Sequence, residues 1–141
     1  FIGLTFSEEQ DVAKSDGSGV VVLRKFGKKW KVLALELNGK YDLPKGKIEK
    51  KETELQAAVR ETKEESGIED LQFTWGNVST RIKHLTFFIA QTDQDAYIPQ
   101  NPESGIYELD RALWLSFKNI KSKCYGYLLP IIEWAESIVI K

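Results

Sequence analysis

The amino-acid sequence predicts an α/β fold in which a mixed β-sheet is packed between helices. Short runs rich in Val, Leu, Ile and aromatic residues recur along the chain and are typical of strands. One long helix is predicted between the second and third of these runs, and an amphipathic helix closes the chain. A sheet with helices on both faces forms an α/β/α sandwich, which is the architecture that we expect.

The predicted elements follow in order along the chain. The predicted strands are residues 19–23, 30–37, 71–80, 84–92 and 112–116. A turn at residues 27–29 joins the first two strands, and we expect a hairpin around residues 81–83 between the next two. Residues 125–138 are apolar at helical spacing and form the predicted closing helix.

The long central helix carries clear start and stop signals. Thr53 is followed three residues later by Gln56, which together can form a capping box. Gly67 supplies the left-handed residue that ends many helices, and Ile68 can make the hydrophobic contact that follows it. The stripe that we expect to be buried consists of Leu55, Ala58, Val59 and Thr62.

The last turns of this helix concentrate carboxylates where a helix should disfavour them. Glu61, Glu64 and Glu65 lie at i, i+3 and i+4, so they repel one another and also oppose the helix dipole. A divalent cation bound on that face would cancel this repulsion, because hard cations prefer oxygen ligands. The alternative is a solvated helix with ordinary pairs such as Arg60 with Glu64.

The loop before the helix supports the metal interpretation. It contains Lys45, Gly46 and Lys47 directly after a proline. Gly46 can bring a bare backbone carbonyl close to a ligand, and the two lysines suit phosphate. Carboxylates for a metal beside lysines for phosphate indicate magnesium-dependent phosphoryl or pyrophosphoryl chemistry.

Residues 46–68 resemble the Nudix box, the 23-residue signature of Nudix hydrolases. The matching positions are Gly46, Glu52, Arg60, Glu61, Glu64, Glu65, Gly67 and Ile68. Thr62 departs from the aliphatic residue usual in the family, although threonine can still cover the core. The box spans about a sixth of the chain, and with the flanking strands the resemblance extends over residues 18–138. It implies a Nudix α/β/α sandwich, and we expect residues 1–141 to form one such domain.

The resemblance also implies roles for individual residues. Mg²⁺ or Mn²⁺ would be bound by the Gly46 carbonyl with Glu61, Glu64 and Glu65. Glu52 would act from a second layer or through water, and Arg60 would orient Glu61. The choice of general base among the glutamates stays open. A further metal ligand is often found in a later loop of these enzymes, and the position of Glu108 six residues before Trp114 favours it over Glu103.

Two features resemble diadenosine tetraphosphate hydrolases within this family. One is the box form Arg-Glu-Thr-x-Glu-Glu-x-Gly-Ile together with Pro44-Lys45-Gly46. The other is Lys83 four residues before Phe87, which implies that Lys83 contacts phosphate and that Phe87 or Tyr107 stacks on adenine. Ala112 stands where that group usually has a tyrosine. Neighbouring strand residues face opposite sides, so at least one of Phe87 and Phe88 is expected in the core.

Bulk properties exclude several other classes of protein. A net charge of −1 argues against a general nucleic-acid or membrane binder, and no apolar run approaches a membrane span. The single cysteine, Cys124, cannot form an internal disulfide and fits a reducing compartment. This composition fits a cytoplasmic protein, the Nudix resemblance implies that it binds a nucleotide, and we expect a monomer. The chain begins at Phe1, so any segment before it is not shown.

The leading functional hypothesis is a pyrophosphohydrolase that cleaves diadenosine tetraphosphate to ATP and AMP. RNA 5′-end pyrophosphohydrolysis or decapping is a second possibility, because residues 43–48 also resemble the start of the decapping box. Against it, the chain has no long basic stripe. Nucleotide-pool cleaning is a third possibility. A non-catalytic nucleotide-binding Nudix domain is a fourth, disfavoured because all four box glutamates are present.

Overall fold

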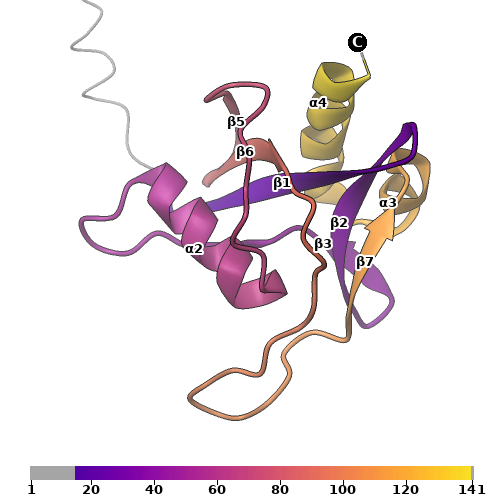
Figure 1. Cartoon of the computed structure of the whole chain (residues 1–141). Helices are drawn as coiled ribbons and strands as arrows, with labels where there is room; N and C mark the ends of the chain where they lie inside the picture. Colours follow the sequence, from indigo (N-terminus) through magenta and orange to yellow (C-terminus); the bar gives the residue numbers. More distant parts are fainter. Residues whose placement is uncertain (1–14, 141) are drawn as a thin grey trace, which may run out of the picture.

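The computed structural model describes residues 15–140, so the first 14 residues and Lys141 of the predicted domain lie outside the described part. The strands form one mixed sheet, and helices lie on either side of it (Figure 1). The strands are β1 Gly17–Phe26, β2 Lys29–Leu37, β3 Lys40–Asp42, β4 Lys45–Lys47, β5 Ser79–Ile82, β6 Leu85–Gln91 and β7 Arg111–Leu115. The helices are α2 Glu54–Ser66, α3 Phe117–Lys123, the 3₁₀ turn η1 Gly126–Leu128 and α4 Leu129–Val139.

The sheet has the strand order β3-β2-β1-β6-β5, with β4 pairing to the start of β1 and β7 pairing to β2. β1 and β6 run parallel and the other pairs are antiparallel, so the sheet is mixed as predicted. The β5–β6 hairpin also forms, with Ile82 opposite Leu85. β4 is positioned by its pairing with β1, in which Ser18 lies opposite Gly46.

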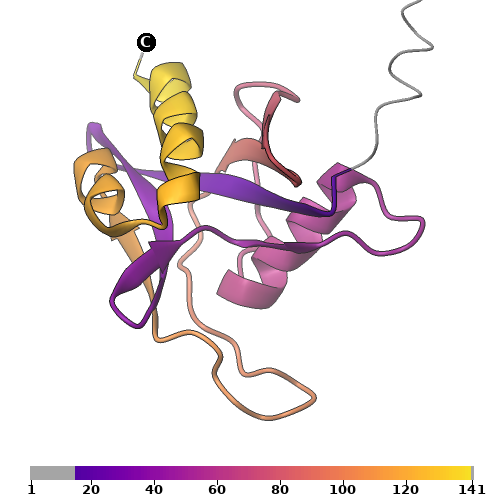
Figure 2. The same cartoon turned by 180° about the vertical axis from the view of Figure 1, so that it is seen from behind.

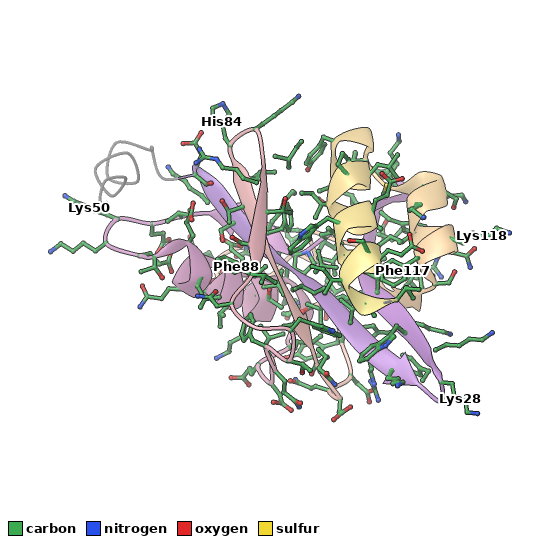
Figure 3. All side chains as sticks on the ribbon, turned by 90° about the horizontal axis from the view of Figure 1, so that it is seen from above. Lys28, Lys50, His84, Phe88, Phe117 and Lys118 are labelled. Atoms are coloured by element: carbon green, nitrogen blue, oxygen red, sulfur yellow. The ribbon has the colours of Figure 1, made fainter. Side chains whose placement is uncertain are left out.

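Alternation along the central strands creates two cores, one on each face of the sheet. Val20, Val22 and Phe88 point toward α2 with Ala58 and Ile68. On the other face, core residues of β1, β2 and β6 pack against residues of α3 and α4, among them Phe117, Ile120, Ile131, Ile132 and Ala135. Figures 2 and 3 show α2 on one side of the sheet and α4 on the other, which is the predicted α/β/α sandwich.

The central helix has the predicted ends. The Thr53 side chain accepts a hydrogen bond from the Gln56 backbone, the Gln56 side chain completes the capping box, and Gly67 ends the helix at φ 75°. The buried stripe differs from the prediction: Ala57, Ala58, Thr62 and Ser66 are buried, whereas Leu55 and Val59 are only half-buried. Thr62 is tolerated in the core because its hydroxyl donates to the Ala58 carbonyl at 2.8 Å.

Several segments of the chain differ from the sequence prediction, among them the predicted closing helix 125–138, which is divided into η1 and α4. Residues 71–78 form a loop rather than a strand. The Trp75 ring packs against the Trp30 ring with 5.3 Å between the ring centroids, and Gly76 adopts φ 92°, which a strand does not have. The short elements β3, β4 and α3 were not predicted. α3 is capped at its N-terminus by Ser116, whose side chain accepts a hydrogen bond from the Asn119 backbone amide. Among the described residues, no helix is long and apolar enough to cross a membrane.

Candidate active site

Gly46 of β4 and Glu61 of α2 meet at the centre of the site. A Cβ atom at position 46 would lie 2.1 Å from Cδ of Glu61 and 2.2 Å from one of its oxygens. The absence of a side chain at Gly46 therefore lets the carboxylate lie directly on the strand. Burial raises the pKa of Glu61, and the negative charge of Glu64 adds to this effect.

Glu65, one turn further along α2, also faces β4. One of its oxygens accepts a hydrogen bond from the Lys45 backbone amide at 3.0 Å. Burial raises the pKa of Glu65 to about 7, and the nearby Glu61 charge acts in the same direction. Two neighbouring carboxylates with raised pKa values are an arrangement that a bound cation would stabilise.

Arg60 connects three of the box carboxylates. Its guanidinium forms two bonds to Glu52, Nε to Oε2 at 2.7 Å and a second nitrogen to Oε1 at 3.0 Å. It also donates to Glu61 at 3.0 Å and to Glu64 at 3.2 Å. A further bond to the Lys47 carbonyl at 2.8 Å links the helix to β4. Arg60 therefore orients Glu61 and neutralises part of the acidic cluster.

A cleft of about 820 Å³ lies between the acidic side of α2 and the loop that joins β6 to β7. The loop passes beneath α2 in the view of Figure 1. Glu103 and Glu108 both line this cleft, and Glu108 accepts a hydrogen bond from Asn101 Nδ2 at 2.7 Å. The structure thus brings Glu108 to the same cleft as Glu61, Glu64 and Glu65 and does not separate it from Glu103.

The two lysines of the preceding loop lie on the other side of β4. The Cβ of Lys45 lies near Gly19, on the side where Phe87 lies, whereas Gly46 faces Glu61. Lys45 Nζ bonds Asp42 at 3.0 Å, and this carboxylate raises the pKa of Lys45 although burial alone would lower it. Lys45 and Lys47 line a separate hollow, so contact with phosphate requires a substrate that crosses β4.

Three predicted substrate-binding residues are not brought to the carboxylate cleft. Phe87 is fully buried in the core that faces α3 and α4, so its predicted stacking on adenine must be given up. Tyr107 is exposed but lines a neighbouring hollow with Ile98 and Leu109. Lys83 lies in the β5–β6 turn beside His84, which Figure 3 shows at the edge of the molecule.

The position of Lys83 relative to α2 explains this separation. Near the start of α2, Glu54 accepts a hydrogen bond from Thr86 of β6, so the β5–β6 turn lies beside the N-terminal end of the helix. Glu65 comes eleven residues later, about 16 Å further along the helix axis. The phosphate contact of Lys83 stays a prediction without support from this arrangement.

The donor set of the site suits a hard divalent cation. Glu61, Glu65 and the Gly46 backbone lie together and offer oxygen ligands, and burial makes their negative charge costly without a cation. Within residues 15–140, no three acidic, histidine or cysteine groups converge as a ready metal cluster. The Glu64 side chain is 56% exposed and is paired with Arg60, so its rotation away from Arg60 would supply the third carboxylate.

Tyr97 is a cleft residue that the sequence analysis did not single out. It lines the cleft and is 58% exposed. The signal that could have found it is an aromatic residue in the segment that follows the predicted strand 84–92. The loop's path back to α2 is a tertiary feature, so the sequence alone could not place this ring beside Gly67.

The structure is an α/β/α sandwich in which a glutamate-rich helix lies against a glycine of the sheet. This is the arrangement that the resemblance of residues 46–68 to the Nudix box implied. The family model described as NUDIX domain matches residues 12–134, and the chain belongs to the Nudix family. A search of curated protein sequences gave no significant match.

Solved structures share this fold. A Caenorhabditis elegans Ap4A hydrolase in a binary complex superposes with a TM-score of 0.72 at 22% identity, over 88% of this chain and 98% of that chain. An Escherichia coli dihydroneopterin triphosphate pyrophosphohydrolase gives 0.63 at 18% identity, over 92% and 99%. The NUDIX domain of Shewanella oneidensis NrtR, complexed with ADP ribose, gives 0.61 at 15% identity, over 92% and 90%.

Proposed function

We propose that this protein is a metal-dependent pyrophosphohydrolase that cleaves dinucleoside polyphosphates such as diadenosine tetraphosphate to ATP and AMP. The observation that carries the proposal is the pair Glu61 and Glu65, two carboxylates with raised pKa values that lie side by side on β4, Glu61 on Gly46 and Glu65 on the Lys45 amide. A fold selected for stability alone would not place them together, because each makes the other's charge more costly.

The charge of the cleft supports metal-dependent binding of an anion. Six glutamates line it, Glu61, Glu64, Glu65, Glu69, Glu103 and Glu108, against the two cations Arg60 and Lys63. A polyphosphate would be repelled from this surface unless divalent cations bridged the two. Bound Mg²⁺ or Mn²⁺ would neutralise phosphate oxygens and lower the pKa of an attacking water.

The chain's own groups have distinct proposed roles in this reaction. Glu61, Glu65 and the Gly46 carbonyl would hold the metal, with Glu64 and Glu108 as further ligands. Arg60 fixes Glu61 and Glu52 through its guanidinium. The raised pKa of Glu65 means that this carboxyl can exchange a proton near neutral pH when no metal is bound. Glu52, Glu61 and Glu64 are the candidates for proton transfer.

The choice of dinucleoside polyphosphates rests on the box form, on Pro44-Lys45-Gly46 and on the shared fold with the Ap4A hydrolase. A polyphosphate chain long enough to reach from the carboxylate cleft to the β5–β6 turn would place its distal phosphates at Lys83, and one that crosses β4 would meet Lys45 and Lys47. Holding the distal phosphates in this way would fix one register of the chain over the metal site and favour asymmetric cleavage. Lys83→Ala should then raise KM for diadenosine tetraphosphate much more than for a mononucleotide. A rise in KM of the same size for both substrates would show that Lys83 does not bind the distal phosphates.

A substrate panel tests the function directly. We would compare kcat/KM for diadenosine tetraphosphate, 5′-triphosphorylated RNA, capped RNA and ADP-ribose, with product identification and with a chelator as control. The proposal expects diadenosine tetraphosphate to be preferred, ATP and AMP as products, and no turnover in chelator. Preference for another substrate by about tenfold or more would replace the substrate class. Metal-dependent binding without turnover of any of them would indicate a non-catalytic nucleotide-binding domain.

A further inference from the structure

Tyr97 stands out as an exposed aromatic side chain in a fixed position. Its neighbours Ala96 and Ile98 both pack into the core between the sheet and α2. With both neighbours anchored, the side chain between them projects outward. Its ring lies on Gly67, where a Cβ atom would come within 2.1 Å of Cε1 and 2.4 Å of Cζ. One side of the ring, from Cδ1 to Cζ, is therefore covered by the glycine, while 58% of the residue stays exposed.

Hydrogen bonds hold this part of the loop to the end of α2. The Tyr97 backbone amide donates to the Ser66 carbonyl at 3.0 Å. The side chain of Gln94 donates to the Gly67 carbonyl at 2.8 Å and accepts from the Glu69 backbone at 2.9 Å. From β1, Arg24 donates to the Gln94 carbonyl at 3.1 Å. The ring is thus held in place before any ligand arrives, which reduces the entropy lost on binding.

The position of this ring relative to the carboxylates suits one nucleotide unit. Tyr97 and Gly67 line the same cleft as Glu61 and Glu65. Among the described residues that line the cleft, Tyr97 is the only aromatic one. A planar base lying against the exposed side of the ring would share this cleft with Glu61 and Glu65, so its phosphates would enter the space that these carboxylates line.

We infer that Tyr97 is the platform on which the nucleobase of the substrate stacks, in place of the predicted Phe87 or Tyr107. This inference rests on the proposed function, because it assumes a nucleotide in the carboxylate cleft. Stacking on an aromatic ring tolerates different bases, since every base has a π-face. Tyr97 would therefore select nucleotides over phosphate compounds without a base, and it would not select one base over another.

Ligands with and without a base separate stacking from a structural role. We would measure Mg²⁺-dependent binding of α,β-methylene-ADP and of methylenediphosphonate, its counterpart without a nucleoside, by titration calorimetry. Tyr97→Leu keeps apolar cover over Gly67 but removes the planar ring. It should weaken α,β-methylene-ADP binding roughly tenfold and change methylenediphosphonate binding less than about twofold. Tyr97→Phe should bind like the wild type, and so should Ile106→Ala, an exposed change in the same loop.

The remaining outcomes decide against the inference or against the function. An equal loss for both ligands, no loss with Tyr97→Leu, or the tenfold loss appearing with Tyr107→Leu instead would overturn the platform. So would a wild-type protein that does not bind α,β-methylene-ADP. A wild-type protein that binds it through Tyr97 but hydrolyses no phosphoanhydride would contradict the proposed function and leave the platform intact.

Discussion

Gly46 and Glu61 touch so closely that no side chain fits between them. The position of a Cβ atom at residue 46 lies 2.1 to 2.4 Å from all three atoms of the Glu61 carboxylate group. Gly46 and Glu61 are fifteen positions apart in the sequence, and the pairing of β4 with β1 holds Gly46 beside α2. The contact fixes where the carboxylate sits relative to the Gly46 backbone.

Gly46→Ala should therefore abolish most activity while the fold survives. Gly46 does not have a positive φ, so alanine can adopt its backbone, and the clash falls on the flexible end of Glu61. We expect kcat to fall about 10²-fold, the scale of losing one well-placed group, with little change in Tm. Gly126→Ala is the matched control, because its Cβ meets nothing within 4 Å. A Gly46→Ala enzyme with normal kcat would show that the position of Glu61 does not matter.

Glu61→Gln and Glu65→Gln should each lower kcat at least ~10²-fold, because each removes a charge that would bind the metal. Both variants should fold, because removing one of two repelling carboxylates is neutral or mildly stabilising in the metal-free protein. Steady-state kinetics and thermal melts in chelator measure the two effects, with Glu133→Gln on α4 as the control. Loss of the fold in either variant would instead indicate a structural role.

The metal-free protein should become less stable as the pH rises through neutrality. Burial raises the pKa of Glu65 to about 7 in the folded state. The unfolded chain releases this proton near its ordinary pKa of about 4.3, so the folded protein binds it more tightly. The stabilisation is complete below about pH 4.3 and is lost as the pH rises through about 7.

Urea unfolding in chelator at about pH 5.5 and about pH 8 measures this effect. We expect the free energy of unfolding to fall over that range by on the order of 2 kcal/mol more in the wild type than in Glu65→Gln. Titrating groups that do not interact with Glu65 contribute equally to both proteins and cancel in the comparison, whereas Glu61, whose charge is coupled to that of Glu65, is part of the measured difference. Parallel pH profiles for the two proteins would show that Glu65 is not protonated near neutrality.

Arg60→Lys should impair activity although the charge is kept. One guanidinium bonds Glu52 twice and also reaches Glu61 and Glu64, which a single ammonium group cannot do. We expect Mg²⁺ affinity or kcat/KM to fall roughly 10- to 100-fold, as for other groups that orient metal ligands. Arg111→Lys, which alters an exposed pair with Glu36, is the control. If Arg60→Lys and Arg111→Lys changed Mg²⁺ affinity and kcat/KM equally, Arg60 would not orient the metal ligands.

The sequence by itself determined the features that depend on neighbours along the chain. The ends of α2 follow from the capping box at Thr53 and from the left-handed Gly67, which are local signals. The strands of the core follow from their apolar runs, and the box motif identified the family. Short elements such as β4 lacked such a signal, because three residues are fixed by pairing with β1 rather than by their own preference.

The tertiary structure decided which side chains share a cleft. Phe87 and Phe88 are both buried in the core, because β6 lies between β1 and β5 and helices cover both faces of the sheet. Neither of the two rings is therefore accessible to a ligand. Lys45 and Gly46 face opposite sides of β4, so a lysine that was predicted to bind phosphate is separated from the predicted metal ligands. Tyr97 reached the end of α2 because hydrogen bonds to Ser66 and from Gln94 fold its loop back. These arrangements depend on contacts between residues far apart in the chain, and sequence periodicity does not encode them.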